Sequence, residues 1–167
     1  MNQFLPFVNQ KRLFASLLLD QAGRVGEQKH LQKSLMEAAI FELTLAIKFY
    51  CAEIASSYHS KNPTAAVDGR TLAGVLAVID RHSPEMQEIL DLETDGNSWL
   101  SSLQSCYRAL SSAPEPGVVK KNQDDNLIAS FSLQEQDWSH LTPEKIAEWI
   151  QSFSEMLERH RSVMMEC

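Results

Sequence analysis

The sequence predicts an all-α protein, an up-down helical bundle of five to six helices around a long central second helix. Three observations support this. Glycine and proline are scarce, at six each in 167 residues, which disfavours a turn-rich β fold. Residues 27–58 contain no glycine or proline. Apolar residues recur at three-and-four spacing between residues 146 and 163. The length suits one domain, so residues 1–167 are interpreted as a single helical-bundle domain.

The first helix is predicted to run from about Pro6 or Val8 to Ala22. Gly23 is expected to end it, because glycine is common just after a helix. The link to the next helix is short, so the second helix should run antiparallel to the first. One apolar face is predicted by residues that recur at helical spacing, namely Leu13, Phe14, Leu17, Leu18 and Ala22.

The second helix is predicted over residues 27–58, where nothing interrupts it before Asn62-Pro63. At 1.5 Å per residue it would be about 50 Å long. Between Leu35 and Ile54 it is apolar on most sides. A helix that is apolar nearly all round is buried. We therefore expect the other helices to surround it.

Three shorter helices should follow. The first is predicted near residues 71–80, although Gly74 weakens it by about 1 kcal/mol relative to alanine. Ser83-Pro84-Glu85 has the cap, first-position proline and acidic first turn that begin a helix. Ser98 is expected to cap the next helix, which carries an apolar stripe.

The chain changes character over residues 111–126, where prolines, serines and mixed charges predict a mobile linker or exposed loop. Residues 127–133 fit a strand, a helix or an extended coil, and the pattern does not decide among them. Thr142 and Pro143 then predict the start of a C-terminal helix. Its apolar seam consists of Ile146, Trp149, Ile150, Phe153, Met156, Leu157, His160 and Val163.

Charge and composition exclude several classes of partner. The chain is acidic, with a formal net charge of -7, whereas nucleic-acid binding depends on neutralising phosphates with basic side chains. No apolar stretch approaches the roughly 20 residues that span a bilayer. The three cysteines form no close pair, which favours reduced thiols. We therefore expect a cytoplasmic protein that binds neither nucleic acid nor membrane.

A search for catalytic and metal-binding motifs yields none, so no catalytic, cofactor or metal residue is predicted. The five histidines lack zinc or di-iron spacing, and His160 is interpreted as a paired interface histidine. Arg24 and His30 have a spacing that resembles the catalytic pair of helical HEPN-type ribonucleases. Val25, where that family usually has a polar residue, and the acidic charge both disfavour a ribonuclease.

The sequence contains four patches of interest: Asn9-Gln10-Lys11 leading into Leu13-Phe14-Ala15, then residues 37–43, Ser98-Trp99-Leu100 and Leu127-Ile128-Ala129. Together these patches resemble a small bacterial family of all-helical proteins whose function is not assigned. The resemblance covers nearly the whole chain and implies a bacterial origin and a helical bundle, but no activity.

The biochemical function stays unknown at the level of sequence, and two hypotheses remain open. The favoured one is a non-enzymatic binding or regulatory module that contacts another protein or a second copy of itself. The alternative is a small-molecule-binding protein or enzyme with a pocket between helices, near Glu42, Phe49, Tyr50 and Glu53. Glu42 and Glu53 attract attention because they lie on a helix that is predicted to be buried. The competing interpretation pairs each with a basic residue of a neighbouring helix.

Overall fold

The computed structural model describes residues 2–112 and 141–165, and every regular element in these ranges is helical. The fold class is therefore all-α, as the sequence predicts. The elements are α1 (Leu5–Arg24), α2 (Lys29–Ser57), the short 3-10 helix η1 (Pro63–Ala65), α3 (Gly69–Ala77), α4 (Pro84–Thr94), α5 (Trp99–Ser111) and α6 (Pro143–Met165).

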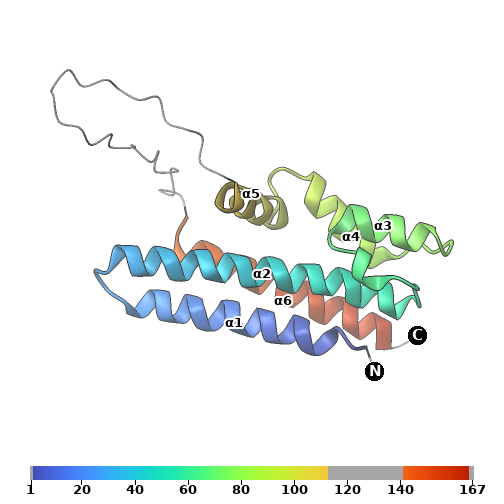
Figure 1. Cartoon of the computed structure of the whole chain (residues 1–167), viewed down its shortest axis with the longest axis horizontal. Coiled ribbons are helices and arrows are strands. Elements are labelled where there is room, and N and C mark those ends of the chain that lie inside the picture. The colour runs from blue at the N-terminus through green and yellow to red at the C-terminus, as the bar shows by residue number, and fades with distance from the viewer. Residues whose placement is uncertain (1, 113–140, 166–167) are drawn as a thin grey trace, which may run out of the picture.

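The three long helices lie side by side, and the three short α-helices cover the other side of α2 (Figure 1). α1 and α2 are antiparallel, and their connection contains Gly26 in the left-handed conformation, with φ +60°. α6 runs in the same direction as α2 and packs against both α1 and α2 (Figure 1). The up-down order thus holds for the first two helices, and α3–α5 lead the chain back along α2 before α6.

α2 is the central helix, as predicted. Its 29 residues span about 43 Å at 1.5 Å per residue. Helices α1, α3, α5 and α6 all pack against it, which explains why its sequence is apolar on most sides. Tyr50 is fully buried, and its ring lies 5.9 Å from that of Phe153 on α6. The buried residues of α2 are Met36, Ala39, Ile40, Leu43, Ala46, Ile47, Tyr50, Cys51, Ala52, Glu53, Ile54 and Ala55.

The sequence prediction for α1 is wrong in two respects. Gly23 does not end the helix, which continues through Arg24. More importantly, the buried face is not the predicted one. Of the five predicted residues only Ala22 is fully buried, while Leu18 is half-buried and the others are exposed. The residues that α1 buries are Val8, Ala15, Leu19 and Ala22. α1 therefore approaches its neighbours partly through alanines.

The caps fix where the shorter helices begin. Ser83 and Ser98 cap α4 and α5 as predicted, each accepting a backbone N–H at 3.0 Å. α3 begins two residues earlier than predicted, because Asp68 and Thr71 form a capping box. It also ends earlier, at Ala77, and Asp80 has a positive φ of 52°.

Gly69, the first residue of α3, packs directly against α4. A Cβ at this position would lie 2.7 Å from Glu93 Oε2 and 3.2 Å from the backbone nitrogen of Leu90. The Glu93 carboxylate accepts the Gly69 N–H at 3.1 Å. A glycine is thus needed for this close approach of α3 to α4.

Thr142 caps α6 as predicted, accepting the Lys145 N–H at 3.2 Å. The apolar seam of α6 is buried from Ile146 to His160, whereas Val163 is 49% exposed. The predicted linker beyond residue 112 and the undecided stretch 127–133 lie outside the described residues. In the part that the structure describes, no helix is both long enough and apolar enough to cross a membrane.

Candidate functional site

The two acidic residues singled out in α2 are both paired with basic residues. The Glu42 carboxylate lies 2.8 Å from Lys11 Nζ on α1. Glu53 is 2% exposed and accepts hydrogen bonds from Arg161 Nε at 2.8 Å and Nη2 at 2.7 Å. Asn9 Oδ1 accepts a third hydrogen bond from Arg161 at 2.9 Å. These pairs tie α1 and α6 to α2, as the structural interpretation of these acids expects.

The four residues of the alternative hypothesis do not surround one cavity. Glu42 and Glu53 are eleven residues apart on one helix, about 16 Å. Glu42 borders a shallow groove between α1 and α2. Phe49 is half-buried with its ring 5.8 Å from that of Phe7. Tyr50 and Glu53 are fully enclosed by helix contacts.

A second buried polar group joins α2, α4 and α6. The Tyr50 hydroxyl lies 2.6 Å from His160 Nδ1, and His160 Nε2 lies 2.8 Å from Glu88 Oε2. Arg159 also binds the Glu88 carboxylate. Burial, followed by the charge of Glu53, raises the pKa of the Tyr50 hydroxyl above its ordinary range. Tyr50 is fully buried and His160 is 6% exposed, so these two members of the chain lie inside the bundle, whereas Glu88 is half-buried at its outer end. His160 is thus the paired interface histidine that the sequence indicates.

The other candidates for chemistry gain no support from the geometry. Arg24 and His30 are both exposed, Arg24 at the last position of α1 and His30 in the first turn of α2. Burial raises the pKa of the Cys51 and Cys106 thiols, which disfavours the reactive thiolate. Within residues 2–112 and 141–165, no group of three or more histidine, cysteine or acidic side chains could hold a metal ion. His140 and Cys167 lie outside these ranges.

The most unusual surface is the outward face of α1. Leu13 is 54% exposed and Leu17 is 55% exposed, while Phe7 and Phe14 are 51% and 39% exposed. All four belong to one helix whose inward face contains alanines. α1 lies at the edge of the molecule, on the side of α2 away from α3–α5 (Figure 1). We call Phe7, Leu13, Phe14 and Leu17 the α1 ridge.

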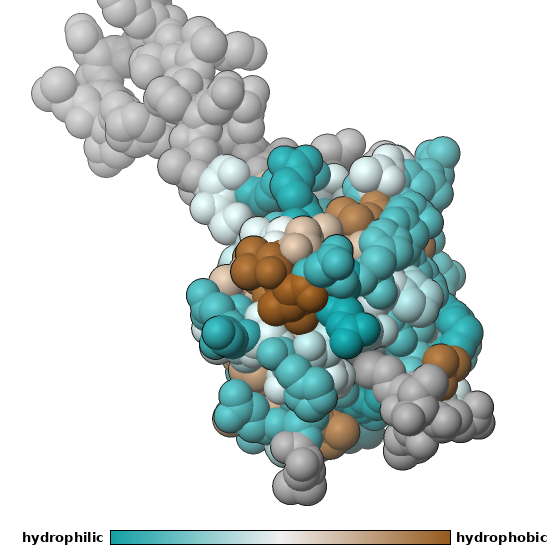
Figure 2. Space-filling view, turned by 90° about the vertical axis from the view of Figure 1, so that its right-hand side faces the viewer, coloured by the Kyte–Doolittle hydropathy of each residue, from teal (hydrophilic) through white to brown (hydrophobic). Residues whose placement is uncertain are grey.

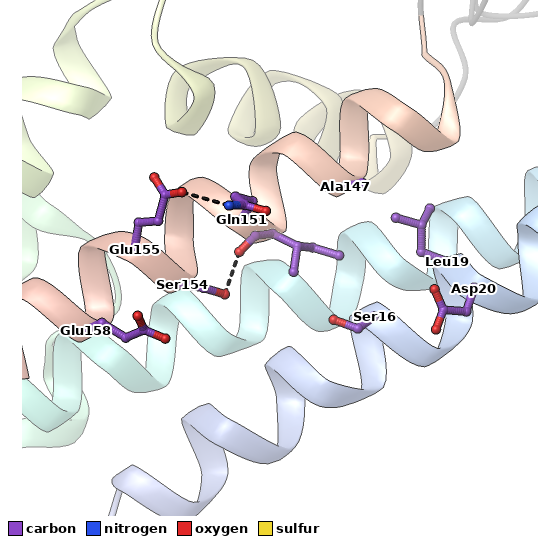
Figure 3. Close-up of a pocket in the computed structure, with 9 residues that line it drawn as sticks. Ser16, Leu19, Asp20, Ala147, Gln151, Ser154, Glu155 and Glu158 are labelled. Carbon is purple, nitrogen blue, oxygen red and sulfur yellow. Dashed lines mark hydrogen bonds between the residues drawn. The ribbon is translucent and has the colours of Figure 1, made fainter.

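A groove lies between α1 and α6 (Figure 3). Its volume is about 340 Å³. Leu19, Ala147 and Ile150 provide apolar walls, and Ser16 and Ser154 add hydroxyl groups. The remaining lining residues are Asp20, Gln151, Glu155 and Glu158.

The groove is acidic. Asp20 comes from α1 and lies towards one end, whereas Glu155 and Glu158 come from α6 and lie towards the other (Figure 3). Gln151 Nε2 donates a hydrogen bond to Glu155 at 2.8 Å. Asp20 and Glu158 form no ion pair or hydrogen bond with other described side chains. Three carboxylates and no lysine or arginine therefore line this groove.

A different apolar area lies at the end of the molecule that carries α3, the start of α1 and the end of α6 (Figure 1). Seen from that end, the surface is mostly hydrophilic and is interrupted by a compact apolar patch (Figure 2). Val78, the C-cap residue of α3, is 86% exposed. Val78 also lines a pocket of about 550 Å³, together with Val75 of α3 and with Ile79, which follows the helix.

The sequence does not reveal the α1 ridge, because the spacing of Leu13, Phe14 and Leu17 also predicts a core face. One signal could have identified it. The other side of the same helix carries Val8, Ala15, Leu19 and Ala22 at helical spacing. A helix with two apolar faces at the edge of a bundle buries one face and leaves the other exposed. Arg161 and Glu88 were missed as partners because their contacts span 108 and 72 residues of sequence.

A search of the curated proteins found no match, and a search of the solved structures found none either. One family matches residues 3–167, which is nearly the whole chain. The chain therefore belongs to this family of unknown function, DUF6586.

Proposed function

We propose that this chain is a non-enzymatic, cytoplasmic protein-binding module that docks a partner protein on the α1 ridge. The observation that carries the proposal is the orientation of α1. Its inward face contacts the bundle partly through Ala15 and Ala22, while two leucines and two phenylalanines face water. An isolated exposed leucine is ordinary, but a cluster of large apolar side chains on one helix is typical of an interaction site.

The size of the ridge suits this role. With exposed fractions near one half, four large side chains offer about 350 Å² of apolar surface, at roughly 150–250 Å² per whole side chain. Functional apolar patches on monomers commonly reach about 300–600 Å². Burying 350 Å² contributes about 9 kcal/mol at 25 cal/mol per Å² before the cost of association is subtracted. The ridge is therefore able to supply much of the apolar centre of an interface of ordinary size.

The buried polar groups support a binding role over a catalytic one. Glu53, Tyr50 and His160 each have a partner inside the bundle, and such pairing stabilises helix contacts without exposing a reactive group. A partner would thus meet a rigid scaffold, and the helix face on that scaffold would provide the specificity.

Site-specific photo-crosslinking in the native cells tests the proposal. A benzophenone amino acid replaces Leu17 on the ridge, and a matched variant carries it in place of Val78, an exposed apolar residue far along the chain. We expect a discrete protein adduct from position 17 that position 78 does not give. The adduct should disappear when Leu13→Gln is added. The proposal is wrong if position 17 gives no adduct, or if both positions give the same adducts.

A further inference from the structure

We propose that the segment docked on the α1 ridge is a cationic amphipathic helix, which lies along the groove between α1 and α6. This inference rests on the proposed function and adds the chemistry of the partner. The partner's apolar side would contact Leu13 and Leu17, and its lysines or arginines would face Asp20, Glu155 and Glu158.

The apolar part of the site is continuous with the groove. On α1, Leu13 precedes Ser16 by three residues and Leu17 precedes Asp20 by three, and residues at this spacing are neighbours on a helix surface. Ser16 and Asp20 line the groove. The exposed leucines therefore form one rim of the groove, and Leu19, Ala147 and Ile150 form its apolar walls. A helix seated over the groove could insert apolar side chains there, which is the usual geometry of helix-in-groove recognition.

The charge of the groove selects the sign of the partner. The carboxylates of Asp20, Glu155 and Glu158 line it, and none of them is paired with a described basic side chain. By contrast, the acids at the contacts of α2 with α1 and α6 each have a basic partner: Glu42 binds Lys11 and Glu53 binds Arg161. Unpaired carboxylates at the rim of an apolar surface favour a cationic partner and speed its association.

The same charges disfavour a second copy of the chain as the occupant. In a symmetric dimer the same patch faces itself. Two copies joined across this groove would bring two sets of three carboxylates together, within a protein whose net charge is already -7. Like charges that face each other across an interface suppress association. A basic helix meets the apolar and the acidic parts of the surface at once.

The test uses two synthetic amphipathic helices of about 18 residues, close to the length of α1. One is built from leucine and lysine, and the other has glutamate in place of every lysine. Their binding to the full chain is followed by fluorescence anisotropy at low and moderate salt. We compare the unmodified protein with the groove variant Asp20→Asn, Glu155→Gln, Glu158→Gln. A control variant, Glu27→Gln, Asp80→Asn, Asp91→Asn, removes three exposed carboxylates elsewhere.

We expect the lysine peptide to bind the unmodified protein and the control variant with similar affinity. It should bind the groove variant about tenfold more weakly, because the rim charges are gone. The glutamate peptide should not bind. Equal affinity of the lysine peptide for both triple variants overturns the inference, since the attraction would then come from net charge alone. Absence of lysine-peptide binding to the unmodified protein, or binding of the glutamate peptide, overturns it as well. Circular dichroism verifies that each variant is folded.

A third variant, Leu13→Gln with Leu17→Gln, separates this inference from the proposed function. If this variant binds neither peptide while the groove variant binds both, the α1 ridge is a docking face and its partner is not selected by positive charge. If it binds the lysine peptide as well as the unmodified protein does, the apolar ridge takes no part, and the proposed function fails. A crosslinked adduct at position 17 that proves to be a second copy of the chain supports docking on the ridge and overturns the cationic partner.

Discussion

Two regions of this molecule reverse the usual distribution of polar and apolar groups. Where the C-terminal ends of α2 and α6 meet, polar and charged side chains lie inside the bundle. Glu53 is 2% exposed and His160 is 6% exposed. On the outward face of α1, large apolar side chains lie in water instead, with Leu17 55% exposed.

The difference lies in whether each group has a partner. Glu53 binds Arg161, and His160 binds Tyr50 and Glu88, so the cost of burying these groups is offset inside the bundle. Leu13 and Leu17 have no comparable cover from the described residues. The first region is therefore explained by folding alone, whereas the second is the surface on which we propose that a partner docks.

The largest expected effect tests the buried polar region. Glu53→Ala leaves the Arg161 guanidinium without its carboxylate, and breaking a buried ion pair costs about 3–5 kcal/mol. We expect the free energy of unfolding, measured by urea denaturation, to fall by about that amount. Glu158→Ala, which removes an exposed carboxylate from the same helix as Arg161, should change it by less than about 0.5 kcal/mol. If the two variants are equally stable, the buried pair does not hold the helices together.

An intermediate effect compares the two faces of α1 directly. Leu19 is 8% exposed and Leu17 is 55% exposed, so the same substitution samples the inside and the outside of one helix. Leu19→Ala should cost about 2–4 kcal/mol, because it removes packed methyl groups and leaves a cavity. Leu17→Ala should cost less than about 0.5 kcal/mol. If both substitutions lower the free energy of unfolding equally, as measured by thermal or urea denaturation, the ridge belongs to the core.

The smallest expected effect concerns the hydrogen bond between Tyr50 and His160. Tyr50→Phe removes the hydroxyl 2.6 Å from His160 Nδ1 and leaves that nitrogen buried without its partner. The free energy of unfolding should fall by about 1–2 kcal/mol. Tyr107→Phe is the matched control, because Tyr107 is half-buried and its hydroxyl makes no hydrogen bond with the described residues. A Tyr50→Phe protein as stable as this control would show that the chain of hydrogen bonds is dispensable.

Much of the fold follows from the sequence because its signals are local. The uninterrupted run over 27–58 and the caps at Ser83, Ser98 and Thr142 predict helices that the structure contains. The predicted end of α1 is wrong. Gly23 lies within the helix, and the left-handed residue of the connection is Gly26 instead. The direction of α6 relative to α2 depends on contacts far apart in sequence, which no local pattern encodes.

The candidate site was less predictable for the same reason. α1 carries apolar residues on two faces, and periodicity alone cannot tell which of them packs against α2. Tertiary packing decides which face is buried: the face with Ala15 and Ala22 packs on the bundle, and the bulkier face stays exposed. The acidic groove forms only because α6 lies beside α1. No local sequence pattern therefore predicts that Asp20 lies near Glu155 and Glu158.

The position of α6 in the bundle also constrains how the chain folds during synthesis. The contact between Glu53 and Arg161 spans 108 residues, so the ribosome needs roughly 5 to 20 seconds to add the intervening chain at about 5–20 residues per second. During that interval the α1–α2 hairpin can form, but the side that α6 covers stays uncovered. We therefore expect the nascent hairpin to be the stage at which this protein is most exposed to chaperones and to aggregation.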